Sequence, residues 1–184
     1  MASGDFKLLD KVWTHTHLSR KHKYQIFNAC IVSKLLYGLQ TSWLTKAQRT
    51  KIDGFQAKCI RKICGVQHSY WSRTSNVEVL SYVGAPKLSN LLLEQQLLVF
   101  GKIYRKPSED ILRRAVFEEE SDMLKVYNKK RRKGRPKLAW AVQVRKIAML
   151  VCANDLGTTM GNAIKWKTIV RKFCRAPCSI PPAA

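Results

Sequence analysis

The sequence predicts an all-α fold, arranged as a multi-helix bundle, on three observations. Apolar residues recur at helical spacing in one segment after another along the chain. Helix-capping patterns, such as Thr45 followed three residues later by Gln48, mark where several of these segments begin. No stretch alternates apolar and polar residues with the period of two that a half-buried strand shows. With 184 residues, 46% of them hydrophobic, the chain is long and apolar enough to bury a core.

The first two helices are expected over about residues 5–13 and 19–36. The second helix is expected to start near Ser19 and to run to Leu36. Their apolar stripes contain Phe6, Leu9 and Trp13 in the first helix, and Tyr24, Ile26, Phe27, Cys30, Ile31 and Leu35 in the second. Gly38 follows the second stripe and predicts the end of that helix, because glycine readily adopts the left-handed conformation of a C-terminal cap.

The third helix is expected to run from the Thr45–Gln48 capping box to Gly65. Its apolar residues recur at i, i+3, i+7, i+8 and i+11, namely Ile52, Phe55, Cys59, Ile60 and Ile63. Its other face carries basic residues that almost no carboxylate opposes: Lys46, Arg49, Lys51, Lys58, Arg61 and Lys62. This helix therefore combines a core face with a basic face.

Three further helices are expected before the composition changes. Ser75 with Glu78 forms a second capping pattern at the start of a short helix. Pro86 opens the most apolar helix of the chain, which runs to about Tyr104 and is expected to form the centre of the core. Ser108 is expected to cap a short helix after it.

A change of composition near residue 118 predicts the domain organisation. The acidic residues Glu118, Glu119, Glu120 and Asp122 are followed by a basic segment, 129–137, in which Gly134 and Pro136 disfavour a helix. Two more helices are expected after it, one with Trp140 and one with Trp166. We expect a helical domain at 1–117, an acidic-then-basic linker at 118–137, a C-terminal helical pair at 138–175 and a tail at 176–184.

The charge of the chain is its most unusual property. It has 34 Lys and Arg residues against 12 Asp and Glu, a formal net charge of +22. Such an excess repels itself in the folded state, so a polyanionic partner is the natural physical explanation. Nucleic acid is favoured over a membrane surface, because no stretch shows a long amphipathic helix with a clean membrane face or an apolar run of about 18 residues.

Ordered motifs resemble one known family. The stretch Leu18–Gly38 contains Ile26-Phe-Asn-Ala-Cys-Ile-Val-Ser-Lys-Leu-Leu-Tyr-Gly38, and Phe55–Gly65 ends in Cys-Ile-Arg-Lys-Ile-Cys-Gly. Leu93–Ile103 contains the pair Phe100-Gly101, and Lys133-Gly-Arg-Pro-Lys137 precedes Trp140. In this order and at about this spacing, the motifs are similar to the region downstream of the polymerase palm in non-LTR retrotransposon reverse transcriptases, where the thumb begins. The resemblance covers about residues 6–173.

The resemblance implies a thumb-like bundle and C-terminal segment without the polymerase itself. The family's chemistry uses metal-binding aspartates, two of them adjacent, to hold two divalent ions. This chain contains no Asp-Asp pair. We therefore expect a nucleic-acid-binding fragment that is not an enzyme by itself and needs no cofactor, with catalysis only if another chain supplied the palm.

The expected nucleic-acid contacts are basic side chains in two places. The thumb surface is expected to consist of Arg20, Lys21, Lys23, Arg49, Lys58, Arg61 and Lys62. The basic segment adds Lys129, Lys130, Arg131, Arg132, Lys133, Arg135 and Lys137. This segment is open to three interpretations, which are a phosphate-binding arm, a nuclear-import signal and an arm that enters a narrow minor groove. For each basic residue, a merely solvated charge is the alternative.

Other chemistry is weakly indicated. Cys59, Cys64 and His68 have the spacing C-x4-C-x3-H, but Cys59 also lies on an apolar stripe, so no metal site is predicted. The six cysteines lack the spacing of a disulfide scaffold, which indicates an intracellular protein, and the basic segment favours the nucleus. Trp13, Trp140 and Trp166 fall on apolar stripes; Trp43 and Trp71 remain open as base-stacking residues.

The identity of the partner stays open at this level. Phosphate contacts carry no base identity, so RNA, DNA and an RNA–DNA hybrid are all possible partners. The alternative function is a structural subunit, recruited from a retroelement into a larger protein or ribonucleoprotein assembly. Such a subunit would have little affinity for naked nucleic acid.

Overall fold

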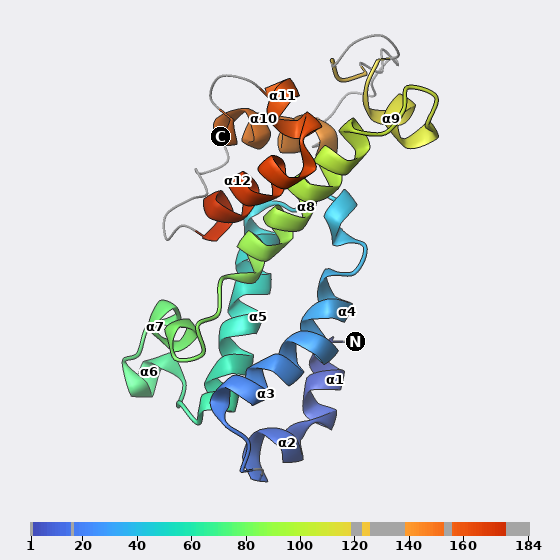
Figure 1. The fold of residues 1–184 in the computed structure, drawn as a ribbon. Helices are drawn as coiled ribbons and strands as arrows, with labels where there is room; N and C mark the ends of the chain where they lie inside the picture. Colours follow the sequence, from blue (N-terminus) through green and yellow to red (C-terminus); the bar gives the residue numbers. More distant parts are fainter. Residues whose placement is uncertain (1, 16, 119–122, 126–138, 153–155, 176–184) are drawn as a thin grey trace, which may run out of the picture. The chain divides into compact units, whose positions relative to one another are not determined.

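The computed structural model describes residues 2–15, 17–118, 123–125, 139–152 and 156–175, and in these residues the fold is all-α (Figure 1). The prediction of a multi-helix, all-α protein is confirmed. The extended backbone in this part of the chain pairs only in an isolated antiparallel bridge between Phe117 and Leu124. The chain divides into two compact units, one of residues 1–39 and 44–92, the other of residues 40–43 and the described residues from 93 onward. The domain boundaries expected from composition remain a prediction.

The first unit is built from short helices around one long helix, α5. Its elements are α1 (Ala2–Leu8), α2 (Asp10–His15), α3 (Arg20–Phe27), the π-helical turn η1 (Asn28–Val32), α4 (Ser33–Leu36), α5 (Lys46–Cys64), α6 (Ser69–Ser72), α7 (Asn76–Ser81) and the first turns of α8 (Leu88–Tyr104). The short 3₁₀ turn η2 (Leu39–Thr41) lies between α4 and α5 in the sequence.

Local capping explains where these helices begin and end. The Ser19 side chain accepts a hydrogen bond from the His22 backbone N–H at the start of α3. At the start of α5, Thr45 and Gln48 form the reciprocal capping box that the sequence predicted. Gly65 ends α5 with a φ of 70°, which is a left-handed conformation that favours glycine.

Two of the expected helices differ from their prediction in detail. The segment expected over residues 5–13 is two helices, because the backbone turns at Leu9, whose carbonyl accepts hydrogen bonds from Val12 and Trp13. The helix expected over residues 19–36 is helical from residue 20 to residue 36, but its middle turn, η1, is a π-helix. A π-helical turn accommodates one extra residue within a helix.

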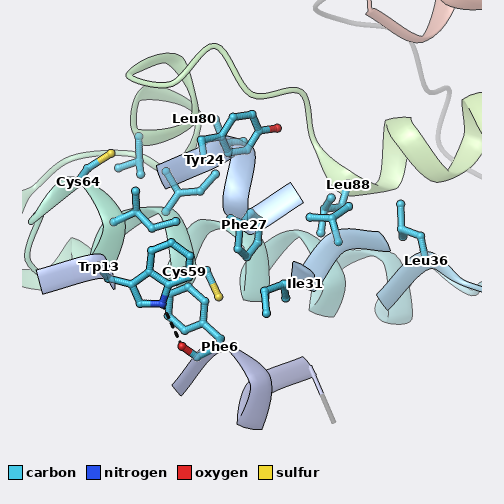
Figure 2. Close-up of a cluster of buried hydrophobic side chains, with 14 of the residues drawn as sticks. Phe6, Trp13, Tyr24, Phe27, Ile31, Leu36, Cys59, Cys64, Leu80 and Leu88 are labelled. Carbon is cyan, nitrogen blue, oxygen red and sulfur yellow. Dashed lines mark hydrogen bonds between the residues drawn. The ribbon is translucent and has the colours of Figure 1, made fainter. Parts of the chain in front are cut away.

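Aromatic packing fixes the N-terminal helices to the core of the first unit (Figure 2). The rings of Phe6 and Trp13 stack with centroids 5.1 Å apart, and Phe27 meets Phe6 edge-on at 6.0 Å. The indole Nε1 of Trp13 donates a hydrogen bond to the Phe6 carbonyl at 2.9 Å, so its polar atom is satisfied. These contacts bury the three rings, as the apolar stripes of the sequence predicted.

Buried polar groups of α5 hold the start of α8. Gln56 is fully buried, and its side chain donates to the Pro86 carbonyl at 2.8 Å and accepts from the Leu88 N–H at 3.0 Å. Asp53 accepts hydrogen bonds from the Ser89 N–H at 2.9 Å and from the Ser89 hydroxyl at 2.7 Å. These bonds satisfy backbone groups that a helix N-terminus otherwise leaves unpaired.

The second unit packs helices around the remainder of α8. Its other elements are α9 (Ile111–Val116), α10 (Trp140–Val151), α11 (Leu156–Gly161) and α12 (Ala163–Arg175). Trp166 of α12 is fully buried, and its indole N–H donates to the Leu97 carbonyl at 3.0 Å. A Cβ atom at Gly101 would lie 2.3 Å from that indole nitrogen, so α8 and α12 approach closely only because residue 101 has no side chain.

Two details of the second unit correct the expectations. The cap of α9 is Asp110, whose side chain accepts from the Leu112 N–H at 2.8 Å, and the prediction of Ser108 as the cap was wrong. The short helix α11 was not expected, because it contains Gly157 and Gly161 and little apolar periodicity.

Candidate nucleic-acid interface

The first basic pair of the expected thumb surface lies at the start of α3. Arg20 and Lys21 are exposed and stand in the first helical turn, which has no acidic residue. Burial raises the pKa of the Cys64 thiol, and the charges of Arg20 and Lys23 partly offset this rise. Arg20 therefore lies beside the C-terminal end of α5, and it is available to a partner in solution.

Lys23 is a structural residue. It is 8% exposed, and its ammonium donates a hydrogen bond to the Trp13 carbonyl at 2.7 Å. This bond joins α3 to the last turn of α2 and holds the ammonium group of Lys23 in the protein interior. Lys23 therefore does not belong to the exposed interface that its position in a basic cluster predicted.

Arg61 is also buried, at 6% exposure, and its guanidinium is held by groups of the loop that follows α5. The partners of its two terminal nitrogens are the Gln67 carbonyl at 3.0 Å, the Ser72 hydroxyl at 3.3 Å, the Thr74 carbonyl at 2.6 Å and the Asn76 side-chain oxygen at 3.1 Å. Such a fork of donors is characteristic of arginine. The sequence placed Arg61 on the basic face, but the structure gives it a folding role.

Three lysines line the outer face of α5. Lys58 and Lys62 were predicted, and Lys51 joins them because residues at i, i+7 and i+11 share one side of a helix. All three are exposed, and Lys62 forms an ion pair with Asp10 of α2. Since residues two apart on a helix do not face each other, Lys62 and Cys64 lie on opposite sides of α5. The Arg20–Lys21 pair and the α5 lysines therefore flank the end of α5 and do not form one patch.

Arg49 lies on a different side of α5 from these lysines. It is half-buried, and burial lowers the pKa of its guanidinium, while the charge of Asp53 one turn later opposes this shift. Asp53 itself accepts the hydrogen bonds that hold the start of α8. Arg49 therefore contributes to the internal electrostatics of the first unit and is not part of the lysine row.

A basic face that the sequence analysis missed occupies α12 in the second unit. Five of its thirteen residues are basic and none is acidic. The exposed residues of this face, in order around the helix, are Lys165, Lys172, Arg175, Arg171 and Lys167, so Lys165 and Lys167 lie at its two opposite edges. The opposite side of the helix is apolar, with Trp166, Val170 and Cys174 buried. The sequence does contain a signal for this face, because the basic residues recur between the apolar ones at helical spacing.

Part of the α12 charge is anchored by a buried carboxylate. Glu94 of α8 has a side chain that is 10% exposed, and its oxygens lie 3.3 Å from Arg171 Nε and 3.8 Å from Arg175 Nε. Burial, with the charge of Glu94 second, raises the pKa of the neighbouring Cys174 thiol to about 12. Arg171 thus donates a hydrogen bond to Glu94 and Arg175 forms a longer ion pair with it, while Lys165, Lys167 and Lys172 are exposed lysines with no acidic residue on their helix.

The basic segment cannot be placed among these surfaces. Its predicted contacts, Lys129, Lys130, Arg131, Arg132, Lys133, Arg135 and Lys137, lie outside the described residues. The acidic residues Glu119, Glu120 and Asp122 do as well.

The tryptophans separate into buried and exposed positions. Trp13 and Trp166 are buried, which confirms their place in the core, and Trp43 and Trp140 pack against the core of the second unit. Trp71, on α6, is 74% exposed. Of the two tryptophans left open by the sequence, Trp71 is therefore the one that is available to a ligand.

The cysteines behave as small apolar side chains where the structure describes them. Cys59 is 2% exposed, and burial raises the pKa of its thiol to about 12, so it stays protonated near neutral pH. His68 is exposed, and within the described residues no three His, Cys, Asp or Glu side chains gather into a group that could hold a metal ion. Cys178 lies outside that part of the chain.

Nowhere in the part of the chain that the structure describes is a helix both long enough and apolar enough to cross a membrane.

Comparison with known proteins gives no match: no protein-family model matches the chain, and neither does any curated protein or solved structure. The likeness to non-LTR reverse transcriptases therefore rests on the four ordered motifs of the sequence.

Proposed function

We propose that this chain is a nucleic-acid-binding helical module of the kind found in the thumb and C-terminal region of non-LTR reverse transcriptases. It holds RNA, DNA or a hybrid of the two through backbone phosphates and does not act as a polymerase by itself. The net charge of +22 supports a polyanionic partner. The proposed relation to the family rests on the four ordered motifs. The proposed binding rests on the net charge and on the exposed basic side chains.

The observation that carries the proposal is the set of exposed basic side chains on α12, a helix that has no acidic residue of its own. Lys165 and Lys172 are seven residues apart, so they lie about 10 Å apart along the helix axis. This separation corresponds to about three phosphates along one strand of a duplex, where successive phosphates are about 3.4 Å apart along the axis. The exposed row of Lys51, Lys58 and Lys62 on α5 is a second surface of the same kind.

Contacts of this type predict how binding will behave. Each phosphate that a lysine neutralises releases counterions, so the logarithm of the affinity falls linearly with the logarithm of the salt concentration. The slope is about −0.9 for each phosphate engaged on duplex DNA. Since phosphates carry no sequence information, binding is expected to be largely independent of base sequence.

The test is a salt titration of affinity with three matched proteins. The wild type is compared with a variant that lacks three charges of the α12 face, Lys165→Gln, Lys167→Gln and Lys172→Gln. A control variant loses three exposed lysines of the N-terminal helices near Asp5 and Asp10, by Lys7→Gln, Lys11→Gln and Lys34→Gln. Both variants have the same net charge, so any difference between them comes from the place of the charges and not from their number.

We expect the α12 variant to have a slope shallower by about 2–3 on duplex DNA, which is the loss of two or three phosphate contacts. The control variant is expected to keep a slope close to that of the wild type. Equal slopes for the two variants would refute the α12 face as the binding surface. An absence of salt-sensitive binding by the wild type to duplex DNA, single-stranded RNA and hybrid would refute the function as a whole.

One observation favours a second candidate, the structural subunit of a larger assembly. On α10, Val142, Met149 and Leu150 are 41%, 49% and 60% exposed, and Lys146 lies between them. A partner helix with an apolar stripe and flanking carboxylates would complement this surface. If Met149→Glu removed the chain from a purified assembly and left its affinity for nucleic acid unchanged, the scaffold function would be supported.

A further inference from the structure

A pair of exposed aromatic side chains stands on the loop between α5 and α7. Tyr70 and Trp71 of α6 are each 74% exposed. Their rings meet edge-to-face, with centroids 5.1 Å apart and an interplanar angle of 89°. The tyrosine and the indole therefore support each other's orientation, and neither is covered by the core of its unit.

The loop that carries this pair is fixed from within by Arg61. The buried guanidinium binds the carbonyls of Gln67 and Thr74, which stand on the two sides of α6. The Ser72 hydroxyl, which also accepts from Arg61, donates in turn to the Gln67 carbonyl at 3.2 Å. A single side chain thus closes the loop at its base, and the aromatic pair stands at its tip.

The backbone at the end of α6 adopts a conformation that few residues take. Arg73 has a φ of 56°, the one positive φ among the described residues that does not belong to a glycine. Its N–H donates to the Ser69 carbonyl at 3.0 Å, which closes the turn. A left-handed non-glycine residue costs on the order of 1 kcal/mol and is maintained only where surrounding contacts determine it. The aromatic pair is therefore held in place before any ligand arrives.

The chemistry around the pair suits a base of a nucleic acid. From Gly65 to Val77 the chain contains no carboxylate, while His68 and Arg73 lie beside the two rings in sequence and are exposed. Exposed aromatic faces next to basic groups are the usual means by which proteins bind unpaired bases, since every base has a π-face that can stack on a ring. An apolar protein partner would leave the basic groups without a counter-charge. An acidic protein partner would leave the exposed aromatic faces without a stacking group.

We propose that Tyr70 and Trp71 form a stacking site for the unpaired bases of a single-stranded segment of RNA or DNA. The inference rests on the proposed function and assigns it a base-contacting site, distinct in its chemistry from the phosphate-binding lysines. Arg61 is a positioning residue of this site, because it acts by holding the loop and its guanidinium is buried away from the ligand. Binding at the pair is tolerant of base identity, because stacking does not read hydrogen-bonding edges.

The experiment separates bases from phosphates with two probes of equal charge. The full chain is titrated with oligo(dT) of about 12 nucleotides and with an abasic oligomer of the same length. The affinity ratio of the two probes measures the contribution of the bases, and quenching of tryptophan fluorescence reports stacking on an indole. The variants are Trp71→Ala, Tyr70→Ala and the conservative Trp71→Phe, with Tyr37→Ala as a control, since Tyr37 is 86% exposed on a different part of the same unit.

We expect the wild type to prefer oligo(dT) over the abasic oligomer by on the order of tenfold. Trp71→Ala and Tyr70→Ala are expected to reduce this preference several-fold, while Trp71→Phe and Tyr37→Ala retain most of it. The fluorescence quenching caused by oligo(dT) is expected to disappear in Trp71→Ala. Because Trp71 is largely exposed, its replacement is expected to leave the helical circular dichroism unchanged.

The outcomes distinguish the failure of this inference from the failure of the proposed function. If the wild type binds both oligomers equally tightly, or if Trp71→Ala keeps the wild-type preference, the stacking site is refuted while phosphate binding stands. If the wild type binds neither oligomer at low salt, both proposals are refuted. If the aromatic pair binds a protein partner and not a nucleic acid, Trp71→Ala keeps the wild-type preference between the two oligomers.

Discussion

At the scale of single residues, Gly101 shows how an absent side chain sets a helix contact. The Trp166 indole occupies the space beside Gly101 and reaches the Leu97 carbonyl, so the ring both fills the core and satisfies its own N–H. In the sequence, Gly101 appears as a glycine inside a helix, which is unfavourable by about 1 kcal/mol relative to alanine. The close approach of α8 and α12 explains why this cost is accepted.

Gly101→Ala is therefore expected to destabilise the protein in spite of the better helix propensity of alanine. The added Cβ would lie 2.3 Å from Trp166 Nε1 and 2.6 Å from its Cδ1, so the indole or the helix must shift. Overpacking of this kind costs about 1–3 kcal/mol, which denaturant unfolding of wild type and variant measures directly.

Gly54→Ala is the matched control for this substitution. Gly54 lies within α5, is exposed, and has no atom within 4 Å of the position of its Cβ, so alanine there is expected to stabilise by up to about 1 kcal/mol. If Gly101→Ala were as stabilising as Gly54→Ala, the packing of Trp166 against Gly101 would be wrong.

At the scale of elements, the loop after α5 depends on a side chain from the helix before it. Arg61 lies in the last turn of α5, where a positive charge is favoured by the helix dipole, and its four hydrogen bonds extend into residues 67–76. The loop contributes few apolar side chains to the core, so these polar bonds are its main attachment. Loss of the guanidinium is therefore expected to release the loop.

Arg61→Lys tests this attachment while it keeps the charge. An ammonium cannot reproduce the planar fork of donors, so buried acceptors lose their partners, at a cost of about 2–3 kcal/mol in the free energy of unfolding. Limited trypsin digestion supplies a local measurement, because cleavage after Arg73 requires the loop to open. We expect this cleavage to be faster in Arg61→Lys under conditions where the rest of the chain stays folded.

Lys58→Arg is the control on the same helix, since Lys58 is exposed and its replacement is expected to change stability by less than about 0.5 kcal/mol. Unchanged trypsin cleavage after Arg73 in Arg61→Lys would show that the loop is held by other contacts.

At the scale of the whole molecule, the sequence predicted what depends on neighbours along the chain and missed what depends on distant ones. The Thr45–Gln48 box and the Gly65 cap were predicted because a cap needs only a few consecutive residues. The burial of Lys23 and Arg61 was not predicted, because their partners are the Trp13 carbonyl and a loop up to fifteen residues away. A basic residue in a basic cluster gives no sign that an unpaired carbonyl lies within its reach.

The same distinction applies to the candidate surfaces. The exposure of Lys58 and Lys62 followed from the opposite apolar stripe of α5, which is a local pattern. The prominence of Trp71 could not be predicted, because the aromatic side chain stands in a connection where no periodicity indicates burial. Its exposure depends on the conformation of the loop, to which the hydrogen bonds of Arg61 contribute.

The net charge of +22 leads to a last prediction, in which stability and binding respond to salt in opposite directions. With 34 Lys and Arg residues against 12 Asp and Glu, most of the basic side chains have no carboxylate to pair with, so the excess positive charge repels itself in the folded state. Raising sodium chloride from 0.1 M to 1 M shortens the screening length from about 10 Å to about 3 Å.

We expect this screening to raise the thermal midpoint by about 2–4 °C, which corresponds to about 1 kcal/mol for a chain of this length. Over the same range the affinity for nucleic acid falls, because the release of counterions into a more concentrated salt solution gains less free energy. The α12 variant, with three charges fewer, is expected to show a smaller gain in midpoint than the wild type. A midpoint that falls with salt would mean that attractive ion pairs outweigh repulsion, and the excess charge would then need no polyanionic partner to explain it.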